Sequence, residues 1–127
     1  AGQTSLEGMI VGFFSTAAGS WNPYQRTLTA AGARVVATRD PRDLSSQFQS
    51  CDALVCDAMA SPLGTLTPAL QQLTRHPAVM SKPKLLLARC SDEPEMIVQR
   101  CGLTMNVYSS PIRGGNLVSI VGRLTAG

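Results

Sequence analysis

The sequence predicts an α/β domain in which helices cover both faces of a parallel sheet. Short apolar runs alternate with segments that carry helix start and stop signals throughout residues 8–124. The runs lack the polar and apolar alternation of half-exposed strands, so we expect strands buried on both faces. With 127 residues, 44% of them hydrophobic and 15% charged, the chain suits one domain with a sizeable core. We expect that domain to span 8–124, with 1–7 and 125–127 as frayed ends or the edges of an excised piece.

Five runs rich in aliphatic residues are the strand candidates. They cover residues 8–14, 33–38, 52–57, 83–90 and 103–108. A helix candidate follows each of them, and this strict alternation predicts a three-layer (βα)5 domain. Because crossovers between parallel strands are right-handed, few strand orders remain, and the flavodoxin-like order 2-1-3-4-5 is the common one for a five-stranded parallel sheet.

The first two helix candidates share one start signal. Asn22 is a predicted N-cap with Pro23 at the first helical position, and Gly32 ends that helix. Asp40 and Pro41 repeat the signal for a short second helix.

Spacing and capping residues predict the other three helices. Leucines at helical spacing between 66 and 73 indicate a third helix. The segment "SDEPEMIVQRCG" predicts a fourth, capped by Ser91 or Asp92 and ended by Gly102. An apolar stripe over 117–124 predicts the fifth.

Composition argues against several classes of function. The net charge of +3 is spread without a basic cluster, which gives no support for nucleic-acid binding. No apolar run approaches the roughly 20 residues that span a bilayer, so we expect no direct membrane contact. The four cysteines form no CxxC pair, and His76 is distant from them in the sequence. We therefore expect no metal site, and reduced cysteines in a cytoplasmic setting.

One acidic residue follows a strand candidate directly. In "ALVCDAMASP", residues 53–62, the apolar run ends on Asp57, and Pro62 follows five residues later. In sheets of this type, ligands and chemistry gather at the carboxyl ends of the strands, near the switch point between strands one and three. Asp57 is therefore the first candidate for a functional residue.

The segment around Asp57 resembles the receiver domains of two-component signalling. In that family the third strand ends in a phosphoacceptor aspartate, followed by a hydrophobic residue and a proline. The stretch "CDAMASP" supplies Asp57, Met59 and Pro62, the proline one place late, and "SSPI" keeps the proline after strand five as Pro111. The opening "SLEGMIVGFF" is similar to the entry into receivers that follow the kinase core in hybrid sensor histidine kinases. The resemblance implies a receiver-like domain with Asp57 at the phosphoacceptor position.

The departures from the family concern residues that support phosphorylation. Receivers hold Mg²⁺ with an acid pair at the end of strand one, where this chain has Phe13 and Phe14. The family's lysine corresponds to Ser110, and its Thr or Ser after strand four corresponds to Ala88 or, with a shift of one residue, Arg89. Mg²⁺ prefers oxygen ligands, and phosphoryl transfer depends on neutralising the phosphoryl oxygens. We therefore expect no cofactor, weak or absent Mg²⁺ binding and no efficient phosphorylation.

These features predict a degenerate receiver-like domain that is not itself an enzyme. The resemblance implies an interaction or regulatory module in a phosphorelay, within a hybrid sensor histidine kinase. The implied partners are a histidine kinase core, a receiver or a phosphotransfer domain, in the same or another chain. The family's contact face runs from strand four to the fifth helix. A cytoplasmic location is expected, and an inner-membrane sensor as the parent protein is compatible with it.

Two other functions stay open from the sequence. The loop "STAAGS" resembles the place where flavodoxins hold the flavin phosphate. Its Ser15, Thr16, Gly19 and Ser20 are the candidate binding residues of a flavin- or nucleotide-binding domain. The second alternative is a working receiver that is phosphorylated on Asp57.

Overall fold

The computed structural model describes most of the chain. The described residues are 6–40, 50–103, 105–109 and 112–126. The second predicted helix falls on 41–49, outside the described residues, as do Ser110 and Pro111.

Five parallel strands form one sheet. They are β1 (Ile10–Ser15), β2 (Arg34–Thr38), β3 (Ala53–Asp57), β4 (Lys84–Ala88) and β5 (Asn106–Ser109). Their order is β2-β1-β3-β4-β5, and every neighbouring pair is parallel. The predicted order 2-1-3-4-5 is confirmed.

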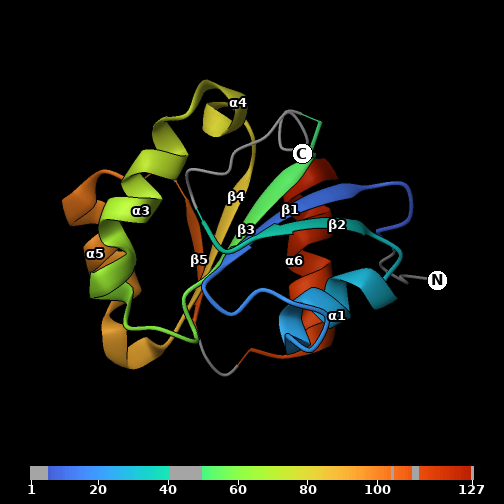
Figure 1. Cartoon of the computed structure of the whole chain (residues 1–127), viewed down its shortest axis with the longest axis horizontal. Helices are drawn as coiled ribbons and strands as arrows, with labels where there is room; N and C mark the ends of the chain where they lie inside the picture. The colour runs from blue at the N-terminus through green and yellow to red at the C-terminus, as the bar shows by residue number, and fades with distance from the viewer. Residues whose placement is uncertain (1–5, 41–49, 104, 110–111, 127) are drawn as a thin grey trace.

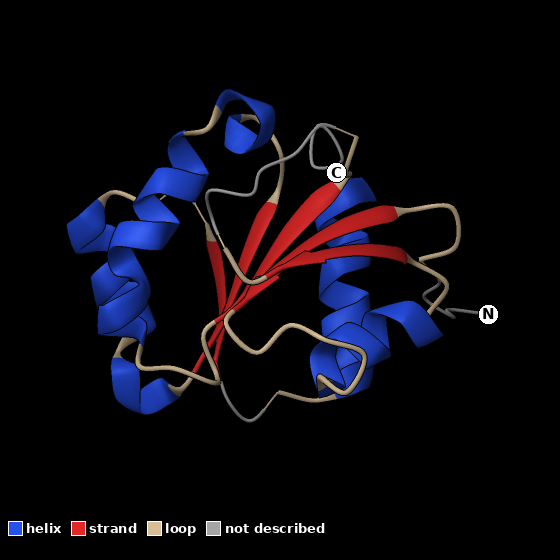
Figure 2. Cartoon of the chain, viewed as in Figure 1, coloured by secondary structure: helices blue, strands red, loops and turns tan. Residues whose placement is uncertain are grey.

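Helices cover the sheet on both faces, as Figures 1 and 2 show. The helices in the described part of the chain are α1 (Pro23–Ala30), α3 (Leu63–Arg75), α4 (Pro77–Met80), α5 (Pro94–Cys101) and α6 (Gly114–Ala126). In Figure 1, α3 and α5 lie on one side of the sheet, and α1 and α6 lie on the other. The predicted three-layer arrangement is therefore present.

Two hydrophobic cores separate the layers, and the central strands contribute to both. Along β4, Leu86 packs in the core under α3 and α5, while Leu85 and Leu87 pack in the core under α1 and α6. All five residues of β3 and of β4 are buried. This two-sided burial is the physical reason why these strands read as continuous apolar runs.

Asn22 caps α1 as predicted. Its side-chain oxygen accepts hydrogen bonds from the backbone N–H groups of Tyr24 and Gln25, and Pro23 is the first helical residue. This places the start of α1 at the carboxyl edge of the sheet, close to the end of β1.

The predicted cap of α5 is wrong. Residues Cys90–Asp92 form a turn of 3₁₀ helix, and the N-cap of α5 is Glu93, which has left-handed backbone angles (φ 48°, ψ 58°). Pro94, whose fixed φ suits the first helical position, sets the start of the helix. The Asp92 carboxylate contacts Arg89 and Leu63 instead.

Other elements also differ from the prediction. The third helix begins at Leu63, so Gly64 lies inside α3, and the short helix α4 was not predicted. Strand β5 begins at Asn106 rather than at residue 103. Leu103 donates its backbone N–H to Val98 instead, which makes it part of the helix stop after Gly102.

Candidate functional site

Asp57 lies at the carboxyl end of β3, in the middle of the sheet. Across β1 its register partner is Ser15, and across β4 it is Leu87. The predicted first strand ended at Phe14, but β1 continues to Ser15. Phe13 and Phe14 are fully buried in the two cores. The side chain that contacts Asp57 from β1 is therefore the Ser15 hydroxyl and not an aromatic ring.

Both carboxylate oxygens of Asp57 accept hydrogen bonds. Oδ2 accepts from Ser15 Oγ at 3.0 Å and from Asn22 Nδ2 at 3.2 Å, and Oδ1 accepts from the Met59 backbone N–H at 2.9 Å. Asp57 is only 2% exposed. A buried carboxylate needs such donors because water no longer supplies them.

Asn22 connects Asp57 to the loop before α1 and to the helix itself. Its Nδ2 group also donates to the Ala17 carbonyl at 3.0 Å, while its Oδ1 caps the helix. One buried amide thus holds the loop, the helix start and the Asp57 carboxylate in a fixed arrangement. We call Ser15, Asn22, Asp57 and the Met59 backbone the Asp57 network.

The sequence identified Asn22 as a cap but gave no hint that it contacts Asp57. The signal lies in the topology. A helix that follows β1 starts at the same edge where β3 ends, because the strands are parallel neighbours. A polar cap at that start therefore lies close to a polar residue at the end of β3.

In the 15–20 loop, the alternative site for a flavin phosphate, backbone N–H groups already donate hydrogen bonds to nearby side chains. Ser15 is buried and its Oγ accepts from the Ala17 N–H, while the Gly19 N–H donates to Gln25 Oε1. Thr16 Oγ1 lies 2.9 Å from Ser61 Oγ, and Ser20 is exposed. Because these N–H groups have acceptors within the loop and the first turns of α1, the arrangement differs from an open phosphate cradle.

Trp21, the sole tryptophan of the chain, follows this loop and lies at the surface. It is 61% exposed, and its indole lies against Gly19, where an added Cβ atom would come within 2.7 Å of Nε1. The absence of a side chain at Gly19 makes room for this packing.

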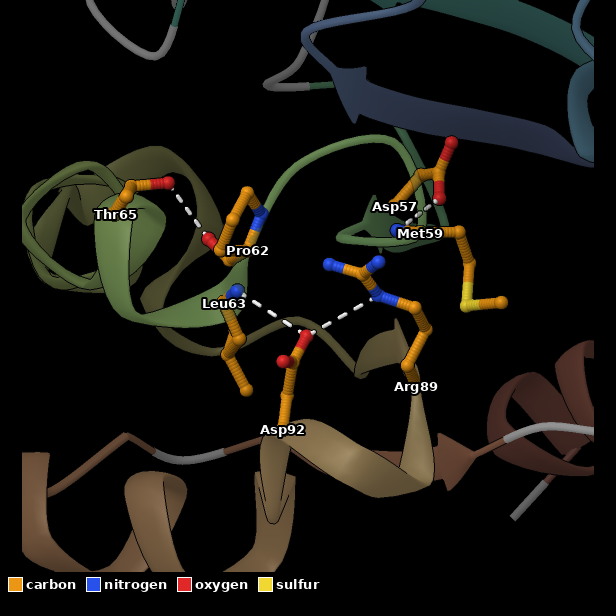
Figure 3. Close-up of polar contacts among 7 residues, drawn as sticks. All are labelled: Asp57, Met59, Pro62, Leu63, Thr65, Arg89 and Asp92. Atoms are coloured by element: carbon orange, nitrogen blue, oxygen red, sulfur yellow. Dashed lines mark hydrogen bonds and ion pairs between the residues drawn. The ribbon is translucent and has the colours of Figure 1, made fainter.

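The end of β4 supplies one cation near the site. Ala88 is buried, and Arg89, which follows it, pairs its Nε with Asp92 Oδ2 at 3.5 Å. Figure 3 shows the Arg89 guanidinium pointing toward the turn that carries Asp57 and Met59. The same Asp92 oxygen accepts from the Leu63 N–H at 3.3 Å, so this ion pair also ties the 3₁₀ turn to the start of α3.

The electrostatic effect of Asp57 extends to Tyr24. Burial and, second to it, the negative charge of Asp57 raise the pKa of the Tyr24 phenol. The tyrosine is therefore neutral at physiological pH.

The resemblance to receiver domains implies Mg²⁺, but the residues around Asp57 do not match the donor set of such a site. Within the described residues, no three His, Cys, Asp or Glu side chains lie together as metal ligands would. The neighbours of Asp57 are a hydroxyl and an amide N–H that donate to it. A hard divalent cation prefers several oxygen ligands, usually carboxylates, so these residues do not fit Mg²⁺ as a receiver binds it.

Two further observations concern the cysteine thiols and the hydrophobicity of the helices. Cys51 and Cys56 are buried, Cys101 is half-buried and Cys90 is exposed, and all four are free thiols. Over the described ranges, no helix is long and apolar enough to cross a membrane.

Solved structures similar to this chain include receiver domains and response regulators. No family model matches the sequence, and no curated protein does. The receiver domain of a histidine kinase from Syntrophus aciditrophicus has a TM-score of 0.70 at 21% identity, over 94% of this chain and 92% of that one. A candidate response regulator of Chloroflexus aurantiacus has 0.70 at 18%, over 94% and 98%.

The chemotaxis protein CheY4 of Vibrio cholerae has a TM-score of 0.69 at 19% identity, over 91% of this chain and 98% of that one. In all three cases the similarity covers nearly the whole of both chains. The chain therefore has the fold of the receiver domains of two-component signalling.

Proposed function

We propose that this domain is a receiver-like interaction module of two-component signalling in which Asp57 holds the site together instead of accepting a phosphoryl group. The observation that carries the proposal is the Asp57 network. Three donors occupy a carboxylate that is only 2% exposed. Attack through Oδ2, which accepts two of these hydrogen bonds, would cost it a hydrogen bond, and neither oxygen has a metal-ligating acid pair to assist it.

The context we propose is a phosphorelay, with the domain as part of a hybrid sensor histidine kinase. Similarity to the receiver domain of the Syntrophus aciditrophicus histidine kinase supports this context. The partner would be a histidine kinase core, a receiver or a phosphotransfer domain, in the same or another chain. The domain would act in the cytoplasm by docking, through the face that runs from β4 to α6, and would not act as an enzyme.

Intact-mass measurement after incubation with acetyl phosphate and Mg²⁺ tests the proposal. We expect an unmodified mass, because the Asp57 oxygens are engaged and the metal ligands of a receiver are missing. A matched sample with Asp57→Ala sets the background. Stoichiometric, base-labile phosphate on the wild type that Asp57→Ala abolishes would show that the domain is a working receiver.

The flavin alternative has its own readout. Addition of flavin mononucleotide should leave the melting temperature unchanged, because the Ala17 and Gly19 N–H groups of the 15–20 loop already have acceptors. A rise in melting temperature that saturates with flavin would favour the alternative.

A further inference from the structure

A groove lies beside the amino-terminal end of α5. Its volume is about 370 Å³. The 3₁₀ turn, the first turn of α5 and the last residue of β5 line it, through Cys90, Glu93, Pro94, Glu95, Met96 and Ser109. No residue of the Asp57 network lines it, so a segment bound in the groove would not contact that carboxylate directly.

The groove offers an apolar side chain that the fold does not bury. Met96 is 49% exposed, one of three large hydrophobic residues exposed in the described part of the chain; the others are Trp21 and Met80. Arg100 Nη2 approaches Met96 Sδ at 3.5 Å from one turn further along α5. A flexible thioether at the surface adapts to different apolar partners.

Two carboxylates line the groove although the chain carries a net charge of +3, and Arg100, one turn further along α5, is the cation beside Met96. Glu93 and Glu95 are both exposed. Arg89, the nearest cation along the chain on the amino-terminal side, is already paired with Asp92. Among the residues that the structure describes, neither glutamate takes part in an ion pair, so both carboxylates face solvent.

We propose that this groove binds a basic amphipathic segment of a partner protein. An apolar side chain of the partner would pack against Met96, and Lys or Arg side chains flanking it would meet Glu93 and Glu95. Apolar anchors supply most of the affinity of such contacts, while opposite charges set orientation and association rate. The inference rests on the proposed function, because it gives the chemistry of a partner for the docking face.

Fluorescence anisotropy with a labelled amphipathic peptide of Leu and Lys tests this inference. The matched probe has Glu in place of every Lys. We expect the Lys peptide to bind and the Glu peptide not to bind. Because two exposed carboxylates contribute, affinity for the Lys peptide should fall as salt is raised and the Debye length shortens.

Three variants assign the binding to the groove. Met96→Ser should weaken binding of the Lys peptide by about tenfold. The double variant Glu93→Gln, Glu95→Gln should weaken it and flatten its salt dependence. Met80→Ser is the matched control, since Met80 is comparably exposed (57%) but lies outside the groove, and it should leave binding unchanged.

Other results would overturn the inference. They are the absence of binding at millimolar peptide, equal binding of both peptides, and an equal loss in Met80→Ser and Met96→Ser. Failure here is distinguishable from failure of the proposed function, because phosphorylation of Asp57 is measured by mass and needs no peptide.

Discussion

Asp57 lies where water does not reach it, and its neighbours supply the hydrogen bonds that water would make. The Ser15 hydroxyl, the Asn22 amide and the Met59 N–H each donate to it. Ser15 and Asn22 are also buried, and Asp57 accepts the hydrogen bond of the Ser15 hydroxyl and one of the two that Asn22 Nδ2 donates, the other going to the Ala17 carbonyl. Removing the carboxylate therefore leaves buried donors unpaired, a loss that costs more than the hydrogen bonds themselves stabilise.

Asp57→Ala should destabilise the domain by about 2–4 kcal/mol, because at least two buried donors lose their acceptor. Urea unfolding followed by circular dichroism measures the change. Glu95→Ala is the control, since Glu95 is exposed, and it should stay within about 0.5 kcal/mol of the wild type. An Asp57→Ala variant as stable as the wild type would show that the Asp57 network does not hold the site together.

Helix α3 contains a proline that interrupts its hydrogen bonds. Pro68 lies inside α3 and has no N–H to donate to the Gly64 carbonyl. The hydroxyl of the neighbouring Thr67 donates to that carbonyl at 3.1 Å instead. The helix persists because Leu66, Leu70 and their neighbours on the same face are buried in the core.

Pro68→Ala should stabilise the domain by about 1–2 kcal/mol, since alanine restores the missing hydrogen bond and the proline's restriction of the unfolded chain offsets part of the gain. Thermal unfolding measures the effect as a higher melting temperature. Ala69→Pro at the next position is the contrasting variant and should unfold at lower temperature. A lower melting temperature for Pro68→Ala would indicate that the proline fits this helix without strain.

The sequence predicts which helices and strands occur better than it predicts the residue at which each one starts. Asn22 and Pro23 define the start of α1 because cap and proline act locally. The predicted cap of α5 was wrong because Asp92 is occupied by Arg89 and Leu63. Leu63 lies far from Asp92 in the sequence, and no local pattern records such a contact. The Ser15 and Asn22 contacts to Asp57 escaped prediction for the same reason.

Alternation and handedness leave few strand orders for the whole molecule, and the common one among them is the order observed, so the topology could be predicted from the sequence. The packing of the Asp57 site was not, because it depends on how β1, β3 and the start of α1 meet in space. The sequence shows that Phe13 is not one of the acids that receivers have at the end of the first strand. Only the register between β1 and β3 shows that Ser15 is the β1 residue beside Asp57.

The buried thiols make the stability of the whole molecule sensitive to high pH. Burial raises the pKa of the Cys56 and Cys51 thiols above their ordinary value near 9. In the unfolded chain these thiols lose their protons near pH 9, whereas in the folded chain they keep them. Their contribution is therefore complete below about pH 9 and is lost as pH rises above it. Burial lowers the pKa of Lys84 below its ordinary value of 10.5, and this acts in the opposite direction while pH rises toward that value.

We expect the free energy of unfolding to fall between about pH 9 and pH 11, because the two thiols act together against the single lysine. Urea titrations at several pH values measure the slope. Cys56→Ala should flatten it, and Cys90→Ala, at an exposed cysteine, should not. A slope that is unchanged in Cys56→Ala would contradict this assignment.

Trp21 gives the molecule a built-in optical probe. Its indole stands at the surface against Gly19, next to the asparagine that binds Asp57. Because the chain has no second tryptophan, fluorescence excited at the long-wavelength edge of tryptophan absorption comes from this one loop. Any event that loosens Asn22 should shift or quench that emission, so the state of the Asp57 carboxylate can be followed in real time without a label.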